Sequence, residues 1–168
     1  PSAFQEIAFS DLKFCTPSGK IELLSSQAKE LWDVSELPSY VPLPDQPVAT
    51  GMLRLMTPNI SSRIHSQFGN LETIKAVSEP PAWELSPSDA SALGLTDGDN
   101  IKISNANGSV TGMLRISNRV RKGSVIFPNG IWKNEGGGVN ALIPGKETDM
   151  GFGSAFHDNL VKVEKYKG

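Results

Sequence analysis

Cysteine is almost absent from this sequence of 168 residues, since Cys15 is the only one. A single cysteine excludes an internal disulfide bond and a metal site built from several cysteines. Histidine is also scarce: a metal site would need Cys15, His65 and His157 to converge, and no two of them have the spacing of a ligand pair on a helix or hairpin. We therefore expect no metal site, and we expect Cys15 to be an ordinary buried thiol.

Long apolar runs are missing as well, and none approaches the ~20 residues that a transmembrane helix needs, so we expect no membrane segment. The pI is about 5.7, and the basic residues are not interleaved with aromatic ones, which argues against nucleic-acid binding. The chain starts at Pro1 without an initiator methionine. We expect an excised segment of a longer polypeptide, whose compartment, cytoplasmic or periplasmic, the sequence leaves open.

The small net charge of −2 hides an uneven distribution. Residues 1–50 carry three basic and seven acidic side chains, a net charge of −4, whereas residues 51–168 carry thirteen and eleven, a net charge of +2. Within residues 101–146, seven basic residues accompany Glu135 alone, which gives a local charge of +6. This charge fits an anionic ligand or an acidic protein face, and it also fits a solvated hairpin surface.

The stretch from Ser86 to Ile116 organises the chain. Ser86 is predicted to cap a short helix with Pro87 at its first position, and Gly94 is predicted to end that helix. Two runs of alternating apolar and polar residues follow, and the turn residues between them indicate a hairpin. A short helix that leads into a hairpin is typical of a β-barrel and is not a catalytic motif.

The remaining elements predict a mainly β fold. We expect further strands at Lys20–Leu24, Gly51–Met56, Val77–Leu85, Ser124–Pro128 and Asn159–Glu164. A brief helix, capped by Ser25 or Ser26, is expected to bury Ala28, Leu31 and Trp32. Four prolines crowd the stretch before Val48, where we place the boundary of the main domain. About six short strands with short helices indicate a closed barrel.

Two polar loops, each next to a predicted strand, hold the candidate functional residues. The first, Thr57–Asn70, is dense in hydrogen-bonding side chains. The second, Asn129–Gly153, is glycine-rich and longer than most connections in a compact domain. Its glycines permit the close approach of an anion without forming a dinucleotide-binding fingerprint. A hydrolase can be drawn from Ser66, His65 and Asp149, but the G-x-S-x-G motif is absent.

Several motifs follow one another along the chain: TPSGKIEL, LMTPN, SRIHSQFGN, SPSDASALGLTDGD, GSVIFP, GGGVNALIP and TDMGFGSAFHD. In this order they resemble the C-terminal domain of molybdopterin-dependent oxidoreductases of the dimethyl sulfoxide reductase type, which include formate dehydrogenases. The resemblance implies a double-psi β-barrel of about six strands with short helices, which closes over a bis-molybdopterin guanine dinucleotide (bis-MGD) cofactor. It implies that residues 1–47 are a linker and remnant of the preceding domain and that residues 48–168 are the cofactor-binding barrel.

The resemblance also implies residue roles. One group matches the family segment that approaches pterin and phosphate groups: Thr57, Asn59, Arg63, His65, Ser66 and Gln67. A second group matches the family's later cofactor loop: Asn140, Thr148 and Asp149. We expect Asp149 to recognise guanine, because a carboxylate accepts hydrogen bonds from guanine N1–H and the 2-amino group together. Thr148 and Asn140 would orient it.

No catalytic or metal-ligating residue is expected in this chain, because the family's iron–sulfur cysteines and metal ligand lie in earlier domains. The rest of the parent enzyme would carry the molybdenum or tungsten, and the isolated domain is expected to be inactive. The partners implied are those preceding domains and an iron–sulfur electron-transfer subunit. The alternative is a stand-alone double-psi barrel that binds an anionic ligand or an acidic protein partner.

Overall fold

The structure is a computed structural model that describes residues 7–41, 51–148, 151–157 and 159–167. The chain divides into two compact units, residues 1–45 and residues 46–168. Within the described ranges, no helix has the length and apolar character needed to cross a membrane.

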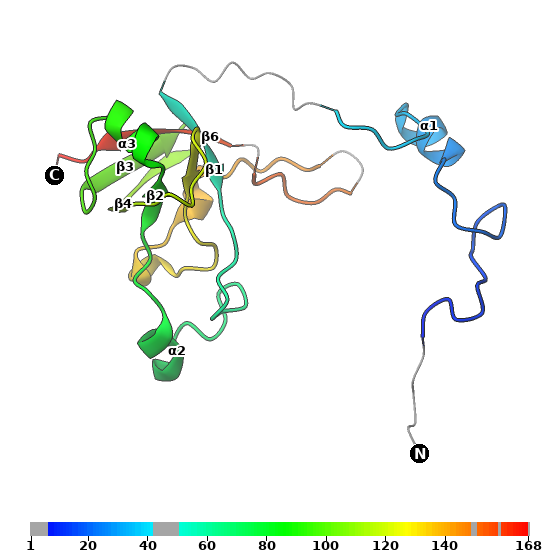
Figure 1. Ribbon diagram of the computed structural model, residues 1–168, viewed down its shortest axis with the longest axis horizontal. Coiled ribbons are helices and arrows are strands. Elements are labelled where there is room, and N and C mark those ends of the chain that lie inside the picture. Colours follow the sequence, from blue (N-terminus) through cyan, green and yellow to red (C-terminus); the bar gives the residue numbers. More distant parts are fainter. Residues whose placement is uncertain (1–6, 42–50, 149–150, 158, 168) are drawn as a thin grey trace. The chain divides into compact units, whose positions relative to one another are not determined.

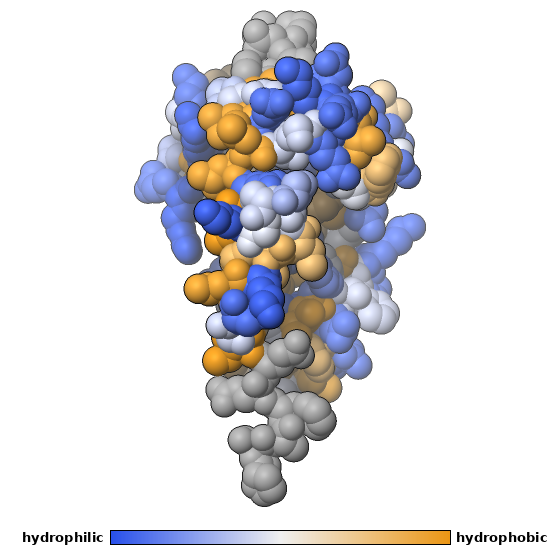
Figure 2. Space-filling model, turned by 90° about the vertical axis from the view of Figure 1, so that its right-hand side faces the viewer, coloured by the Kyte–Doolittle hydropathy of each residue, from blue (hydrophilic) through white to orange (hydrophobic). Residues whose placement is uncertain are grey.

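The first unit contains helix α1 (Ser26–Trp32) (Figure 1). Ser25 caps it, as one of the two predicted caps, and its Oγ accepts a hydrogen bond from the Ala28 N–H at 3.1 Å. The expectation that α1 buries its apolar side is wrong, because Leu31 and Trp32 are 62% and 45% exposed. Within residues 7–41 no side chain is buried, so this unit offers α1 no core to pack against. In Figure 2, exposed apolar residues (orange) lie among polar residues (blue) on the face of the molecule that is drawn.

Two other expectations for the first unit are also wrong. Lys20–Leu24 forms no strand but bends and irregular backbone, and the Thr16 hydroxyl donates to the Lys20 carbonyl at 2.6 Å. A strand needs a neighbouring strand for its backbone hydrogen bonds, and residues 7–41 contain none. Cys15 is exposed rather than buried, for the same lack of a core.

Within its described residues, the second unit is a closed barrel of six strands: β1 (Met52–Met56), β2 (Trp83–Leu85), β3 (Asn100–Asn105), β4 (Gly108–Ile116), β5 (Ser124–Ile126) and β6 (Leu160–Lys165). The order around the barrel is β1-β5-β2-β4-β3-β6. β5 therefore lies between β1 and β2, and β2 lies between β4 and β5. The β1–β2 and β4–β5 connections each pass one intervening strand, and these interlocked crossings make a double-psi β-barrel, as predicted.

Helix α3 (Pro87–Ala92) and the hairpin after it confirm the predicted central stretch. The Ser86 Oγ accepts a hydrogen bond from the Asp89 N–H at 3.1 Å, and Gly94 adopts a φ of +66° just past the helix. β3 and β4 then pair antiparallel along their lengths. The buried Asp89 carboxylate also accepts a hydrogen bond from the Gly123 N–H at 2.8 Å, which ties α3 to the turn before β5.

The core lies inside the barrel. Trp83 on β2 packs against Phe127, just past β5, with ring centroids 4.5 Å apart. Gly112 on β4 leaves room for the Trp83 ring, since a Cβ there would lie 2.8 Å from it. The other large side chains that are fully buried are Leu55, Leu85, Ile101, Ile103, Leu114, Leu142, Val125 and Val161. This core fixes the strand ends from which the loops emerge.

The segment before β2 differs from the expectation. The predicted strand Val77–Leu85 is only three residues long, and helix α2 (Glu72–Val77) precedes it. Pro80 and Pro81 lie between α2 and β2. Because proline has no N–H to donate to a neighbouring strand, these two residues explain why the strand does not extend further toward Val77.

The long loop after β5 has more structure than its weak periodicity predicts. It contains two short 3-10 helices, η1 (Lys133–Glu135) and η2 (Val139–Leu142). Val139 and Leu142 are buried and hold this loop on the barrel.

Candidate functional site

The two polar loops emerge side by side from the barrel. β1 and β5 are adjacent parallel strands, with Leu55 paired to Val125, so their C-terminal ends lie at the same edge. The segment after β1, residues 57–71, therefore starts next to the segment after β5, which begins at Phe127. Binding residues are disproportionately found on loops that a rigid scaffold positions.

Hydrogen bonds of Asn129 connect the first residues of the two loops. Its backbone N–H donates to the Pro58 carbonyl at 3.0 Å. Its side-chain amide donates to the Thr57 carbonyl at 3.3 Å and to Oδ1 of Asn59 at 2.7 Å. The sequence pattern did not mark Asn129 as functional, although an Asn-Gly pair directly after an apolar strand was an available signal.

Two further contacts join the loops. The Trp132 indole N–H donates to the Ser66 carbonyl at 2.7 Å. Gly130, with a φ of +72°, lies so close to His65 that a Cβ would overlap the His65 backbone carbonyl. The close approach of the two backbones therefore requires glycine at this position.

An ion pair completes the connection. Arg63 Nη1 and Nη2 donate to Glu135 at 2.8 and 3.3 Å, and the Arg63 side chain is only 6% exposed. Gly69 leaves space for the guanidinium, because a Cβ there would overlap it. The hydrogen bonds from Arg63 hold the pKa of the Glu135 carboxyl below its ordinary value, although burial acts in the opposite direction. We call the contacts made by Asn129, Gly130, Trp132 and the Arg63–Glu135 pair the loop clasp.

Beside the loop clasp lies a hollow of about 400 Å³, the first hollow. It is lined by Thr57, His65, Ser66, Asn129, Gly130, Val139, Asn140, Ile143, Ser154 and Phe156. Four residues of the predicted site thus meet in one place: Thr57, His65, Ser66 and Asn140.

The first hollow is polar but carries little charge. None of the described residues that line it is Asp, Glu, Lys or Arg. Hydroxyl and amide side chains offer donors and acceptors, whereas Val139, Ile143 and Phe156 offer apolar surface. This mixture suits the edge of a heterocycle with several N–H and C=O groups. It suits a phosphate less well, since phosphates favour arginine.

The family model described as "Molydopterin dinucleotide binding domain" matches residues 53–160. The chain belongs to this family. The match contains most of the barrel, both polar loops and all ten residues of the first hollow. The function of the family, binding a molybdopterin dinucleotide, agrees with the cofactor that the sequence motifs imply.

Relatives of this molybdopterin dinucleotide-binding domain include reductases. The chain is 31% identical over 170 residues to the dimethyl sulfoxide reductase DmsA of Escherichia coli, covering 89% of the chain and 21% of DmsA. It is 33% identical over 153 residues to the probable oxidoreductase YoaE of Bacillus subtilis, covering 89% of the chain and 22% of YoaE. The chain thus spans about a fifth of the length of these relatives.

A solved structure supports the fold. Acetylene hydratase from Pelobacter acetylenicus matches with a TM-score of 0.65 and 21% identity, over 95% of this chain and 25% of the hydratase. None of the comparisons favours a stand-alone interaction module.

Three other predicted residues of the first loop lie outside the first hollow. Asn59 and Arg63 line a separate, second hollow, which shares no lining residue with the first. Gln67 closes a turn within the loop, since its N–H donates to the Ile64 carbonyl at 2.9 Å.

The later loop folds back on itself near Thr148. The Thr148 N–H donates to the Gly153 carbonyl at 2.7 Å, and the Gly153 N–H donates to the Thr148 hydroxyl at 3.0 Å. A bridge between Glu147 and Ser154 continues this pairing toward the first hollow. Asp149 lies outside the described residues.

Within the described ranges, no group of three His, Cys, Asp or Glu side chains is placed to hold a metal ion. His157 is exposed and packs edge-on against the Phe156 ring, with centroids 4.5 Å apart. His65 lines the first hollow instead.

Proposed function

We propose that this chain is the cofactor-binding domain of a larger molybdenum- or tungsten-dependent oxidoreductase, and that the first hollow receives part of its bis-MGD cofactor. The observation that carries the proposal is the convergence of Thr57, His65, Ser66 and Asn140 on one hollow within the family match. The similarity to DmsA and YoaE supports the redox class of the parent enzyme.

The residues present fit the heterocyclic part of this cofactor. Asn140 carries a donor and an acceptor, which a pterin or guanine edge requires, and Asn129, whose amide donates to Thr57 and Asn59, offers its side-chain oxygen as an acceptor. The pyrophosphate fits elsewhere, because the first hollow has no arginine or lysine. Contact between Arg63 and a phosphate, as the resemblance implies, would have to compete with Glu135.

The guanine base would be recognised by the later loop. In this proposal Asp149 accepts hydrogen bonds from guanine, and Thr148 and Asn140 orient it. The support is the position of Asp149 directly after Thr148, whose hydroxyl and N–H are fixed by Gly153. The bridge at Ser154 and the presence of Asn140 in the first hollow link this loop to the same site.

The metal-bearing cofactor supplies the redox chemistry when it is bound. The residues of this chain bind the cofactor, orient it through hydrogen bonds and exclude water from it. No residue of the chain is assigned a catalytic role, and the isolated chain is expected to be inactive. The metal ligand, the substrate site and contacts with an iron–sulfur electron-transfer subunit belong to the rest of the parent polypeptide.

The test is an analysis of the full-length polypeptide for metal and for guanine nucleotide released by acid. We expect molybdenum or tungsten together with guanine nucleotide. Asn140→Ala should lower the guanine content, whereas Asn134→Ala, exposed on the same loop, should not. A polypeptide with neither metal nor guanine nucleotide would contradict the proposal.

A further inference from the structure

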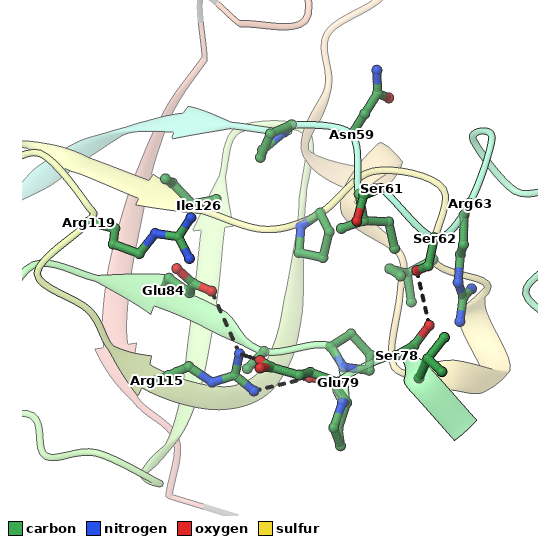
Figure 3. Close-up of a pocket in the computed structure, with 18 of the residues that line it drawn as sticks. Asn59, Ser61, Ser62, Arg63, Ser78, Glu79, Glu84, Arg115, Arg119 and Ile126 are labelled. Carbon is green, nitrogen blue, oxygen red and sulfur yellow. Dashed lines mark hydrogen bonds and ion pairs between the residues drawn. The ribbon is translucent and has the colours of Figure 1, made fainter. Parts of the chain in front are cut away.

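The second hollow, which Asn59 and Arg63 line, is larger than the first, with a volume of about 590 Å³ (Figure 3). Its walls are residues 58–63, residues 77–82 and the faces of β2, β4 and β5 that carry Glu84, Arg115 and Ile126. It shares no lining residue with the first hollow, which is proposed to receive the heterocyclic part of the cofactor. Asn59 and Arg63, which the family resemblance assigns to the cofactor, lie at one end of the second hollow, and Arg63 is paired there with Glu135.

Part of the wall of the second hollow is apolar and fixed in shape, and it lies beside polar and charged residues. Four prolines line it: Pro58, Pro80, Pro81 and Pro128. Proline fixes its own backbone dihedral and has no N–H to donate. Val77 stands beside them and is 74% exposed. A preformed apolar wall of this kind suits the side chains of an extended protein segment, because little ordering of the wall is needed on binding.

Most of the charged groups in the second hollow are already paired. Arg115 donates to Glu79 at 2.6 Å and lies 3.8 Å from Glu84. The Ser62 and Ser78 hydroxyls bond one another at 3.0 Å (Figure 3). Arg63 is held by Glu135. These charged and hydroxyl groups are satisfied by one another, so they do not need a ligand to complete their hydrogen bonds or ion pairs.

Arg119 is the exception. Its guanidinium has no ion pair or side-chain hydrogen bond within the part of the chain that the structure describes, and Figure 3 shows it near Glu84 and Ile126. It belongs to the turn of residues 117–123, which also carries Arg121 and Lys122 and has no carboxylate. Among the described residues that line the second hollow, Arg119 is therefore the cation without an ion pair, although Glu79 and Glu84 equal Arg115 and Arg119 in number. A carboxylate on the occupant would pair with Arg119.

We infer that the second hollow binds an extended acidic segment of the parent polypeptide from outside these 168 residues, with its apolar side chains on the prolines and a carboxylate on Arg119. Length argues for this source: the chain covers only 21% of DmsA and 25% of acetylene hydratase. The choice of source rests on the proposed function, which makes this chain one domain of a longer protein.

The test uses the full-length polypeptide with Arg119→Lys, treated with a carbodiimide that joins an amine to a carboxylate in contact with it. We expect peptide mapping by mass spectrometry to find position 119 joined to an Asp or Glu outside residues 1–168. The matched variant Arg121→Lys, exposed on the same turn but outside the second hollow, should give no such link.

A link only to Glu84, a link to a separate protein, or no link at position 119 would overturn the inference. Metal and guanine content of the same Arg119→Lys sample separates the two proposals. A cofactor-loaded polypeptide without the link overturns the docking segment alone. A polypeptide without cofactor contradicts the proposed function, whatever the cross-linking shows.

Discussion

Arg63 and Glu135 meet through two hydrogen bonds, at 2.8 and 3.3 Å, although 72 residues separate them in the sequence. The Arg63 side chain is 6% exposed and that of Glu135 is 24% exposed, so the pair is largely shielded from water. In this geometry Arg63 ties the two polar loops together. It would become a phosphate ligand only by sharing or releasing Glu135.

Arg63→Met should destabilise the barrel by about 2–3 kcal/mol, because removal of one partner of a shielded pair leaves the other charge uncompensated. Urea denaturation measures the change. The control is Lys162→Met, which removes the partner of Glu164 in a pair whose side chains are 57% and 45% exposed. An exposed pair contributes about 1 kcal/mol at most. Equal losses for the two variants would mean that the Arg63–Glu135 pair is no more than a surface ion pair.

The same pair predicts a pH dependence. Hydrogen bonds from Arg63 hold the pKa of Glu135 below its ordinary value of 4.5. A lowered folded-state pKa gives stability that is present above the ordinary value and is lost as the pH falls through the folded-state pKa. The stability difference between the wild type and Glu135→Gln should therefore be full near pH 7 and shrink below about pH 4. Urea denaturation of both proteins across this range checks it, and a constant difference would refute it.

The fold was largely predictable because its signals are local. The Ser86 cap, the glycine after α3 and the alternation in β3 and β4 each act within a few residues. The errors in the first unit arose where local signals depend on distant surfaces, as they also did for the burial of Cys15. The periodicity of α1 predicts a helix but not whether its apolar side meets a core. A strand at Lys20–Leu24 would need a partner strand, which its unit lacks in residues 7–41.

The candidate site was predictable only in part. The family motifs identified both loops, and the parallel pairing of β1 with β5 explains why the loops meet. The loop clasp was not predictable, because nothing near Arg63 indicates Glu135 as its partner. The requirement for glycine at position 130 was not predictable either. It comes from the backbone of His65, which lies near Gly130 only in the folded structure.

Gly130→Ala should open the loop clasp, because it adds a Cβ where the His65 carbonyl lies and strains a φ of +72°. Gly136→Ala is the matched control, with a φ of +87° and no atom near its Cβ position. The control isolates the backbone strain, about 1 kcal/mol, and the overlap at Gly130 should add about 1–3 kcal/mol. Thermal or urea unfolding measures both. Equal destabilisation of the two variants would show that the loops separate freely.

Asn129→Asp should weaken the junction of the loops while keeping the shape of the side chain. The amide donates to the Thr57 carbonyl and to Asn59 Oδ1, and a carboxylate would face two acceptors. We expect a loss of about 1–3 kcal/mol and faster hydrogen exchange in residues 127–131. Asn134→Asp, exposed on the same loop, should change neither. Unchanged exchange in Asn129→Asp would show that the backbone contacts suffice.

Asp149→Asn tests the proposed recognition of guanine. Guanine presents N1–H and the 2-amino group together, which a carboxylate accepts, whereas adenine lacks this pair of donors. In NMR titrations of this chain, GDP should shift Thr148 and Asn140 more than ADP does, and Asp149→Asn should reduce that preference. Because an unsatisfied buried group costs about 1–3 kcal/mol, the preference should fall roughly tenfold. Glu147→Gln, which removes an exposed carboxylate from the same loop, should leave the preference unchanged. If GDP and ADP shift the same residues equally in the wild type, the later loop does not recognise the base, and guanine must be recognised by another part of the parent enzyme.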